Sequence, residues 1–374
     1  MPKTKIFIIA GEVSGDLHGS NLLKELNKLM PGSVFSGWGG DRMEKEGMTI
    51  QKHIKELSFM GFLEVLLNLS TILRNIKHCK LQILEFKPAA LILIDFPGFN
   101  LRIAKWAKEQ NIPVIFYISP QIWAWKQSRI KLIKRDISKM YCILPFEKEF
   151  YAKLDFQVTY LGHPLLDEIS NYKSNTINLA SFSEKPILAL LPGSRSQEVK
   201  RKLPLMIEAS KAFPNYQVVV ACSTNLEEAF YRKWADDSIK LVVGETYGIL
   251  NQASIALVTS GTATLETALF QVPQVVCYKS SGISYRIAKL LVKIKYISLV
   301  NLIMDKEVVT ELIQGDCSVE NMKMELLLLE KNQPKRLEMI KNYQELSSLL
   351  GEIGASNRIA VDIIETFFAK KGNQ

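Results

Sequence analysis

Cysteine and histidine are scarce in this sequence of 374 residues. Five cysteines and four histidines are scattered along the chain, and no two cysteines form a Cys-x-x-Cys pair. Scattered thiols are typical of proteins in a reducing compartment, and they argue against a disulfide framework or a zinc site. The composition therefore predicts a protein without disulfides and without a bound metal.

Long hydrophobic runs are also absent. No window approaches the roughly 20 apolar residues that a membrane span needs, since the stretch 59–73 contains Glu64, Asn68 and Ser70. The N-terminal apolar run, Ile6–Ala10, is too short for the core of a signal peptide and leads into a turn. We therefore expect a first strand there, and a cytoplasmic protein that touches membranes only from the side.

Basic residues outnumber acidic ones, with 47 Lys and Arg against 38 Asp and Glu, which leaves a net charge of +9. A hydrophobic content of 47% excludes a disordered chain, and the length suits two domains. The positive excess favours an anionic partner: a phosphorylated substrate, a nucleic acid or an anionic membrane surface. The charge alone does not choose among these partners.

Short apolar runs alternate with segments of helical period, which indicates an α/β fold whose parallel sheets are covered on both faces. The predicted strands are Lys5–Ala10, Val34–Gly37, Ala89–Asp95, Val114–Ile118, Met140–Leu144, Ile187–Leu191, Gln217–Ala221, Lys240–Val243, Ile255–Thr259 and Val275–Tyr278. The polar segment 167–185 contains no such run and is predicted to be a linker. The expected organisation is a first domain over 1–166, a second over 186–348 and a C-terminal helix within 349–374.

Two turns in the second half have the composition of anion-binding sites. The strand Ile187–Leu191 leads into Gly193, Ser194 and Arg195. Here a flexible glycine and a permanent cation meet at the N-terminus of a helix that Ser194 or Ser196 can cap. The strand Ile255–Thr259 leads into a second turn of small residues, comprising Ser260, Gly261, Thr262 and Ala263, with Glu266 in the helix that follows.

Together these turns fit a nucleotide diphosphate, with Glu266 accepting hydrogen bonds from ribose hydroxyls. They do not fit a P-loop, because the pattern G-x-x-x-x-G-K-[ST] does not occur. The alternative is that the Ser and Thr side chains only cap helices and that Arg195 lies in water.

In the first half, polar residues follow two predicted strands. The turn after the first strand supplies Glu12, Ser14, Gly15 and Asp16, although it lacks the G-x-G-x-x-G spacing of a dinucleotide site. Asp95 ends the strand Ala89–Asp95, and Asn100 is a good N-cap for a helix from Leu101. A carboxylate at the mouth of a parallel sheet is either a general base or a structural acceptor for turn amides, and spacing alone does not decide between them.

Two stretches of the sequence indicate what the protein binds. Residues 57–76 carry an apolar helical stripe broader than usual, which indicates either a fully buried helix or one that contacts lipid. Residues 123–135 place five basic residues behind Trp123 and Trp125, which suits a membrane interface or a phosphorylated ligand. A solvated helix face is the plain alternative, and nucleic acid is a weaker one because no recognition module accompanies the cluster.

Taken together, the motifs resemble the lipid A disaccharide synthase family, inverting glycosyltransferases of the GT-B type. The motifs that carry the resemblance, nearly end to end, are AGEVSGDLHG, FMGFLEVL, IDFPGFN, YISPQIWAWK, ILPFEKEFY, LGHPL, LLPGSRSQEV, TSGTATLE and ISLVNLIM. The resemblance implies two Rossmann-like domains whose parallel sheets face a central cleft, with a last helix that returns to the first domain. It implies transfer of a sugar from UDP-2,3-diacylglucosamine to the 6-hydroxyl of 2,3-diacylglucosamine 1-phosphate, with release of UDP and without a cofactor.

The resemblance also implies roles for particular residues. Asp95 falls on the family's essential aspartate, Arg195 on its essential arginine and Asn301 on a polar position near the donor. Gly98 stands where many relatives have a second acidic residue, which leaves Asp95 as the candidate base. Because the substrates carry acyl chains, the residues expected to contact lipid or the membrane surface are Phe62, Leu63, Leu66 and Leu69.

The implied partners are the two lipid substrates and the cytoplasmic face of the inner membrane, with a homodimer left open and nucleic acid dropped. The alternatives that keep the fold are a UDP-N-acetylglucosamine 2-epimerase or another lipid-acceptor N-acetylglucosaminyltransferase. A non-catalytic two-lobed binding protein is a third reading, and it is disfavoured because the usual export signal is missing.

Overall fold

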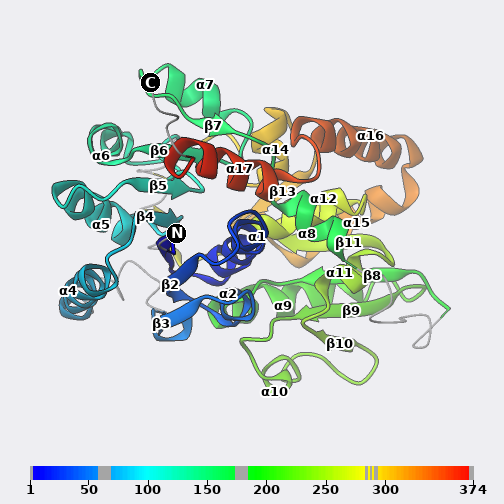
Figure 1. Ribbon diagram of the computed structural model, residues 1–374. Helices are drawn as coiled ribbons and strands as arrows, with labels where there is room; N and C mark the ends of the chain where they lie inside the picture. Colours follow the sequence, from blue (N-terminus) through cyan, green and yellow to red (C-terminus); the bar gives the residue numbers. More distant parts are fainter. Residues whose placement is uncertain are drawn as a thin grey trace. The chain divides into compact units, whose positions relative to one another are not determined.

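The computed structural model describes residues 3–57, 69–172, 184–282, 285–286, 289 and 294–369. The chain divides into two compact units. Unit 1 comprises Met1–Ser170 and Leu350–Gln374, and unit 2 comprises Asn171–Leu349. Each unit contains one parallel sheet with helices packed on it (Figure 1).

Unit 1 has a seven-stranded sheet in the order β3-β2-β1-β4-β5-β6-β7, with every pair parallel. Its strands are β1 (Lys5–Ala10), β2 (Val34–Gly39), β3 (Thr49–His53), β4 (Ala90–Ile94), β5 (Val114–Tyr117), β6 (Lys139–Cys142) and β7 (Thr159–Tyr160). Its helices are α1 (Val13–Leu29), α2 (Asp41–Lys45), α4 (Leu69–Phe86), α5 (Pro97–Glu109), α6 (Ile130–Asp136), α7 (Glu147–Ala152), α8 (Leu165–Asn171) and α17 (Ala355–Phe367), with short 3₁₀ turns at Ile54–Leu57 and Gln127–Arg129.

The continuous apolar run of β1 is explained by burial on both faces of the sheet. Phe7 and Ile9 belong to a core with residues of α4, α5 and α6. Ile6 and Ile8 point the other way, into a core with residues of α1, α2 and α17. Successive strand residues alternate between faces, so a strand that is covered twice must be apolar at every position. Figure 1 shows the two helical layers of unit 1.

The C-terminal helix α17 belongs to unit 1, where it packs against α1. The carboxylate of Asp167 accepts hydrogen bonds from the backbone N–H groups of Gly354, Ala355 and Ser356 at 2.5, 3.2 and 2.8 Å, which caps this helix. The segment predicted as a linker, 167–185, therefore begins with five residues that the structure assigns to α8, while 173–183 lie outside the described residues. Asp167, the first residue of this segment, is polar because it caps α17, and the linker itself stays a prediction.

Unit 2 has a six-stranded sheet in the order β10-β9-β8-β11-β12-β13, again with every pair parallel. Its strands are β8 (Ile187–Leu191), β9 (Gln217–Cys222), β10 (Lys240–Val243), β11 (Ala253–Thr259), β12 (Gln274–Tyr278) and β13 (Thr310–Ile313). Its helices are α9 (Ser196–Ser210), α10 (Glu228–Tyr231), α11 (Thr246–Leu250), α12 (Thr262–Leu269), α14 (Leu299–Met304), α15 (Val319–Lys331) and α16 (Gln333–Leu349).

All ten predicted strands are present, but β3, β7 and β13 were not predicted. Each of the three lies at the edge of its sheet, where a strand is partly exposed and needs no continuous apolar run. Among the described helices, none is long and apolar enough to cross a membrane.

Candidate active site

The loops that carry the predicted site residues meet at one point in each sheet. In unit 1, β1 lies between β2 and β4, and in unit 2, β8 lies between β9 and β11, so the strand order reverses at these central strands. The loops that follow β1 and β4, and likewise β8 and β11, leave neighbouring strands at the same carboxyl edge. Open parallel sheets bind ligands at such topological switch points.

Asp95 and Phe96 form an unusual turn after β4. Both have left-handed backbone conformations, with φ of 45° and 48°, which is rare for residues with a side chain. The Asn100 amide supports the turn by donating hydrogen bonds to the carbonyls of Ile94 and Asp95 at 3.2 and 2.8 Å. The prediction that Asn100 is the N-cap of a helix from Leu101 is wrong. The helix α5 begins at Pro97 with Phe96 as its N-cap residue, since proline suits the first helical position.

The surroundings of Asp95 favour its neutral form. Burial, followed by the nearby carboxylates of Glu12 and Glu147, raises the pKa of Asp95 to about 7, and a hydrogen bond from the Phe96 N–H only partly opposes this. A carboxyl group with a pKa near the working pH is well matched to removing a proton from a hydroxyl group. Of the predicted rim residues, Glu12 is therefore electrostatically linked to Asp95.

Close packing joins the turn after β1 to the turn after β4. A Cβ atom at Gly11 would lie 2.4 Å from the ring of Phe96, so only glycine allows this approach. Gly15 lets α1 lie close to Ala10, the last residue of β1, because a Cβ atom at Gly15 would be only 3.3 Å from the Cβ atom of Ala10. Ser14 is partly exposed in the first turn of α1.

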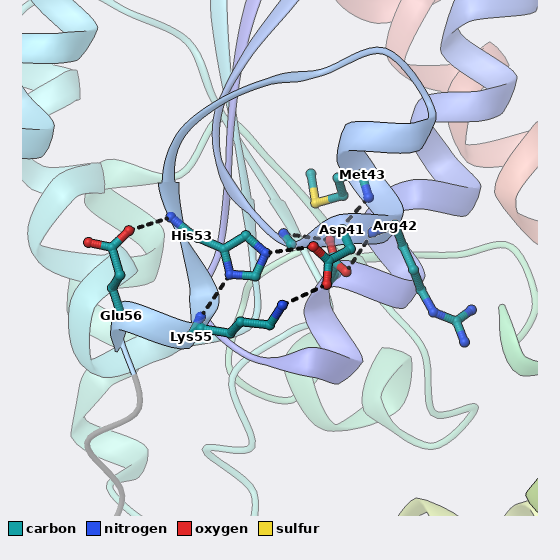
Figure 2. Close-up of polar contacts among 8 residues, drawn as sticks. Asp41, Arg42, Met43, His53, Lys55 and Glu56 are labelled. Carbon is teal, nitrogen blue, oxygen red and sulfur yellow. Dashed lines mark hydrogen bonds and ion pairs between the residues drawn. The ribbon is translucent and has the colours of Figure 1, made fainter. Parts of the chain in front are cut away.

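Asp16 has a structural role. Its side chain is 4% exposed, and its carboxylate accepts hydrogen bonds from the N–H groups of Gly40, Arg42 and Met43 at 2.7, 3.1 and 3.2 Å. Figure 2 shows this helix start, with the neighbouring Asp41 contacting His53 and Lys55. The Asp16 carboxylate thus caps α2, and a role for Asp16 at the acceptor site stays a prediction.

Glu147 is a buried carboxylate that sequence reasoning missed. It accepts hydrogen bonds from the Ser119 hydroxyl at 2.6 Å, the Trp123 indole N–H at 3.0 Å and the Leu144 N–H at 3.0 Å. Burial raises its pKa. These contacts tie the loop after β5 to the loop after β6, so the motifs YISPQIWAWK and ILPFEKEFY form one structure. The motif also contains Lys148 and Glu149, so no signal in the sequence singled out Glu147.

In unit 2, Arg195 stands at the start of α9. Gly193 has φ of 112°, and a Cβ atom there would lie 2.2 Å from a carboxylate oxygen of Glu198. The Arg195 side chain is 55% exposed and lies 3.5 Å from Glu198. Arg195 itself is the N-cap residue and makes no side-chain capping hydrogen bond. The prediction that Ser194 or Ser196 caps this helix is therefore wrong, because Ser196 is already its first residue and Arg195 holds the N-cap position.

The second turn of unit 2 begins α12. Gly261 has φ of 142°, and both Gly261 and Thr262 are exposed, while Ala263 is partly exposed. The Ser260 hydroxyl donates to the carbonyl of Ile297 at 2.9 Å, and Glu266 accepts from the Tyr247 hydroxyl at 3.3 Å. The exposed backbone of this turn can approach an anion closely, as expected of a glycine-containing helix start.

Asn301 is fully engaged inside unit 2. It is completely buried; its amide donates to the Val309 carbonyl and to Glu311 at 2.8 and 2.9 Å, and its oxygen accepts from the N–H groups of Val308 and Val309 at 2.8 and 3.0 Å. An amide side chain has two donors and two acceptor positions, and all of them are used in these contacts, which hold α14 against β13. A contact between Asn301 and the donor stays a prediction.

Lys202 is a second residue that sequence reasoning missed. It is 2% exposed, and its ammonium group donates to the hydroxyl of Thr259, the last residue of β11. Burial lowers its pKa, while the charge of Glu198 raises it. Lys202 follows Arg195 by seven residues, or about two helical turns, and that spacing was the available signal. Its charge therefore lies between α9, which starts at the Arg195 turn, and β11, which ends at the Ser260 turn.

At its switch point, unit 1 thus presents a carboxyl group of raised pKa. Unit 2 presents two glycine-containing helix starts, one of them beside the guanidinium of Arg195. Within the described ranges, no group of three or more His, Cys, Asp or Glu side chains is placed to hold a metal ion.

Residues 6–361 match the model of the family described as lipid-A-disaccharide synthetase. The chain is 37% identical to a lipid-A-disaccharide synthase of Myxococcus xanthus (strain DK1622) over 371 residues, covering 96% of this chain and 97% of that protein. It is 38% identical to a lipid-A-disaccharide synthase of Anaeromyxobacter dehalogenans (strain 2CP-1 / ATCC BAA-258) over 373 residues, with coverage of 96% and 97%.

Solved structures share the fold at much lower identity. One is a UDP-GlcNAc 2-epimerase from Neisseria meningitidis bound to UDP-GlcNAc, with a TM-score of 0.69 and 13% identity over 97% of this chain and all of that chain. Another is the calicheamicin glycosyltransferase CalG4, with a TM-score of 0.62 and 14% identity over the full length of both chains. These neighbours confirm the expected GT-B-like class of two Rossmann-like domains, while a central cleft between them stays a prediction.

Proposed function

The chain belongs to the lipid-A-disaccharide synthetase family, and from this premise we propose how its residues divide the reaction. The enzyme is a glycosyltransferase of lipid A biosynthesis that condenses UDP-diacylglucosamine with diacylglucosamine 1-phosphate. The proposal concerns the mechanism: a single in-line displacement at the anomeric carbon of the donor, which inverts it and forms a β-1,6 link.

Asp95 is the general base of this proposal. The displacement requires removal of a proton from the acceptor's 6-hydroxyl as its oxygen bonds to the anomeric carbon. The observation that carries the assignment is a carboxyl group at the switch point of unit 1 whose pKa is raised to about 7 by burial and by two neighbouring carboxylates. The ionised Asp95 accepts the proton while the bond to the UDP oxygen breaks.

The donor diphosphate is assigned to unit 2. The departing UDP gains negative charge in the transition state, and preorganised cations and helix N-termini stabilise such charge. Support comes from the exposed guanidinium of Arg195, the exposed turn at Gly261 and Thr262, and the buried ammonium of Lys202 behind both. The other predicted donor-site residues take no part in bond making or breaking. They form the two turns or, for Glu266, the helix that follows: Gly193, Ser194, Ser260, Ala263 and Glu266.

The epimerase alternative does not have equal support. The epimerase similarity lies at 13% identity, a level that reflects the fold alone, whereas the curated relatives described above are synthases at 37% and 38% identity.

The test is product formation. Purified protein is incubated with UDP-diacylglucosamine and diacylglucosamine 1-phosphate in neutral detergent, and the tetraacyl disaccharide 1-phosphate is sought by mass spectrometry. We expect Asp95→Asn and Arg195→Met each to lower turnover at least ~100-fold, with thermal unfolding still cooperative. Asp155→Asn, at an exposed position in the loop before β7, and Arg232→Met, at an exposed position after α10, are the matched controls. Full turnover in the Asp95 variant would remove it as the base.

Peripheral membrane association is part of the proposal. Of the residues predicted to contact lipid, Phe62, Leu63 and Leu66 lie outside the described residues, and Leu69 is described only as the first residue of α4. Further along the same stripe, Leu73 is 57% exposed while Ile76 is 8% exposed and buried in the core of unit 1.

An exposed leucine on the stripe supports lipid contact, and liposome co-sedimentation tests it. Leu66→Ser with Leu69→Ser should weaken binding, whereas Met324→Ser with Leu328→Ser, which removes exposed apolar side chains from unit 2, should not. Equal binding by both double variants would contradict the membrane role of the stripe.

A further inference from the structure

Two cationic side chains lie against Trp125 in unit 1, and a third cation is near them. The Lys126 ammonium lies 4.4 Å from the centre of the Trp125 ring, and the Arg129 guanidinium lies 5.2 Å from it. Burial lowers the pKa of Lys126 and of Arg129, and the nearby charge of Arg102, on α5, lowers both further. We call these four residues the Trp125 cluster.

The cluster lacks acidic partners. Within the part of the chain that the structure describes, no carboxylate forms an ion pair with Arg102, Lys126 or Arg129, and Arg102 instead donates to the Gly98 carbonyl. Other cations of the same unit are paired, including Lys55 with Asp41, Arg135 with Asp136 and Lys139 with Asp362. Three like charges held together repel one another, so this arrangement favours an anionic ligand.

The loop that carries Trp125 and Lys126 is anchored by Glu147. Ser119 and Trp123, which precede Trp125 in this loop, both donate hydrogen bonds to the buried Glu147 carboxylate. Lys126 itself has a left-handed backbone conformation with φ of 53°. Arg129 is only partly exposed, whereas Arg102 and Lys126 are exposed. The anchored loop restricts the backbone that carries Lys126, which reduces the conformational freedom lost when an anion binds.

The cluster also lies at the reacting edge of unit 1. The loop with Trp125 and Lys126 follows β5, the neighbour of β4, whose end carries Asp95. Arg102 lies on α5, which begins directly after the turn formed by Asp95 and Phe96. A ligand whose hydroxyl group meets Asp95 can therefore direct an anionic group of the same molecule toward the cluster.

We propose that the Trp125 cluster binds the phosphate monoester of the acceptor and so selects acceptors that carry a phosphate at the anomeric position. This inference rests on the proposed function, in which the acceptor meets Asp95. A phosphate dianion suits two guanidinium groups, which can each donate paired hydrogen bonds, and one ammonium group, which acts as a compact charge. The indole ring holds two of the cations by cation–π contact.

The experiment compares two acceptors: diacylglucosamine 1-phosphate and the same lipid without its phosphate. Binding is measured by titration calorimetry in neutral detergent, and turnover with saturating donor is measured separately. In Lys126→Met with Arg129→Met, we expect Kd and KM for the phosphorylated acceptor to rise at least tenfold. Both constants for the dephosphorylated acceptor should change less than twofold, and kcat less than threefold.

The matched control is Lys105→Met with Lys108→Met, which removes the same charge from exposed positions of α5. It should leave the preference for the phosphorylated acceptor intact. Removing mutually repelling charges should not lower the melting temperature of the cluster variant, so a folding defect would be recognised. Anionic phosphatidylglycerol vesicles provide a third probe, because a lipid headgroup offers similar phosphate chemistry.

The inference is overturned if the cluster variant keeps the wild-type preference, if it weakens both acceptors equally, or if it loses only vesicle binding. Failure of the proposed function would appear differently, as no disaccharide from the wild-type protein with either acceptor. Calorimetry still reports on the phosphate preference in that case, because binding does not require turnover.

Discussion

The raised pKa of Asp95 makes a quantitative prediction about stability. Burial and two neighbouring carboxylates raise this pKa from 3.8 to about 7. Because each pKa unit corresponds to about 1.36 kcal/mol, the ionised carboxylate destabilises the folded state by at most roughly 4 kcal/mol. The Asp95 side chain is partly exposed, and water screens its charge, so we expect about 1–3 kcal/mol.

The pH dependence of this effect has a definite sign. Below about pH 4, Asp95 is protonated in both the folded and the unfolded chain, and the penalty is absent. Between about pH 4 and pH 7 the unfolded chain loses the proton first, so folding becomes progressively less favourable, and above pH 7 the full penalty is present. Asp95→Asn removes the charge at every pH, so its advantage over the wild type should grow from near zero at pH 4 to its maximum at pH 8.

Tryptophan fluorescence during thermal unfolding is a suitable assay, because Trp38, Trp106, Trp123 and Trp125 lie in unit 1 and only Trp234 lies in unit 2. At about 2–4 °C for each kcal/mol, the variant should melt roughly 2–12 °C higher than the wild type at pH 8. Asp41→Asn is the control of opposite sign, because Lys55 and His53 lower the pKa of Asp41, and it should not raise the melting temperature at pH 8. A gain that does not vary with pH, or a loss at pH 8, would refute the argument.

Two further predictions follow from the same residues and their neighbours. Since a general base must be ionised, kcat/KM for the acceptor should fall about tenfold for each pH unit below about 7; a pH–rate profile that is flat from pH 5.5 to 8 would exclude this role. Asn301→Ala leaves the N–H groups of Val308 and Val309 without their partner and should cost about 2–4 kcal/mol of stability in chemical denaturation. Asn321→Ala, which removes one exposed hydrogen bond, should cost less than about 1 kcal/mol, and equal losses in the two variants would show that Asn301 is not structural.

The sequence by itself determined the α/β class and the central strands of both sheets. A strand such as β1 or β8 is covered on both faces, and only a continuous apolar run satisfies that environment. The edge strands have no such constraint: β3 has the polar sequence TIQKH and β13 the sequence TELI. The pattern of apolar residues therefore predicts strands that are buried on both faces and can miss strands that are partly exposed.

The sequence also located the turns at the switch points, since glycine, hydroxyl and charged residues directly after an apolar strand are visible in one dimension. It could not assign roles within those turns. Asp16 and Asp95 both lie in polar turns that follow strands. Asp16 accepts three backbone hydrogen bonds, whereas burial and nearby carboxylates raise the pKa of Asp95. Only the contacts made by folding separate a cap from a candidate base.

Tertiary structure likewise decided the roles of residues whose partners are distant in the chain. Asn301 is the polar residue of the motif ISLVNLIM, which made it a candidate for donor binding. In the structure its amide forms four hydrogen bonds within unit 2. Arg102 joins Lys126 and Arg129 across 24 to 27 residues of sequence. Electrostatic and hydrogen-bond energies depend on distances in space, and the sequence records only which groups are available to be brought together.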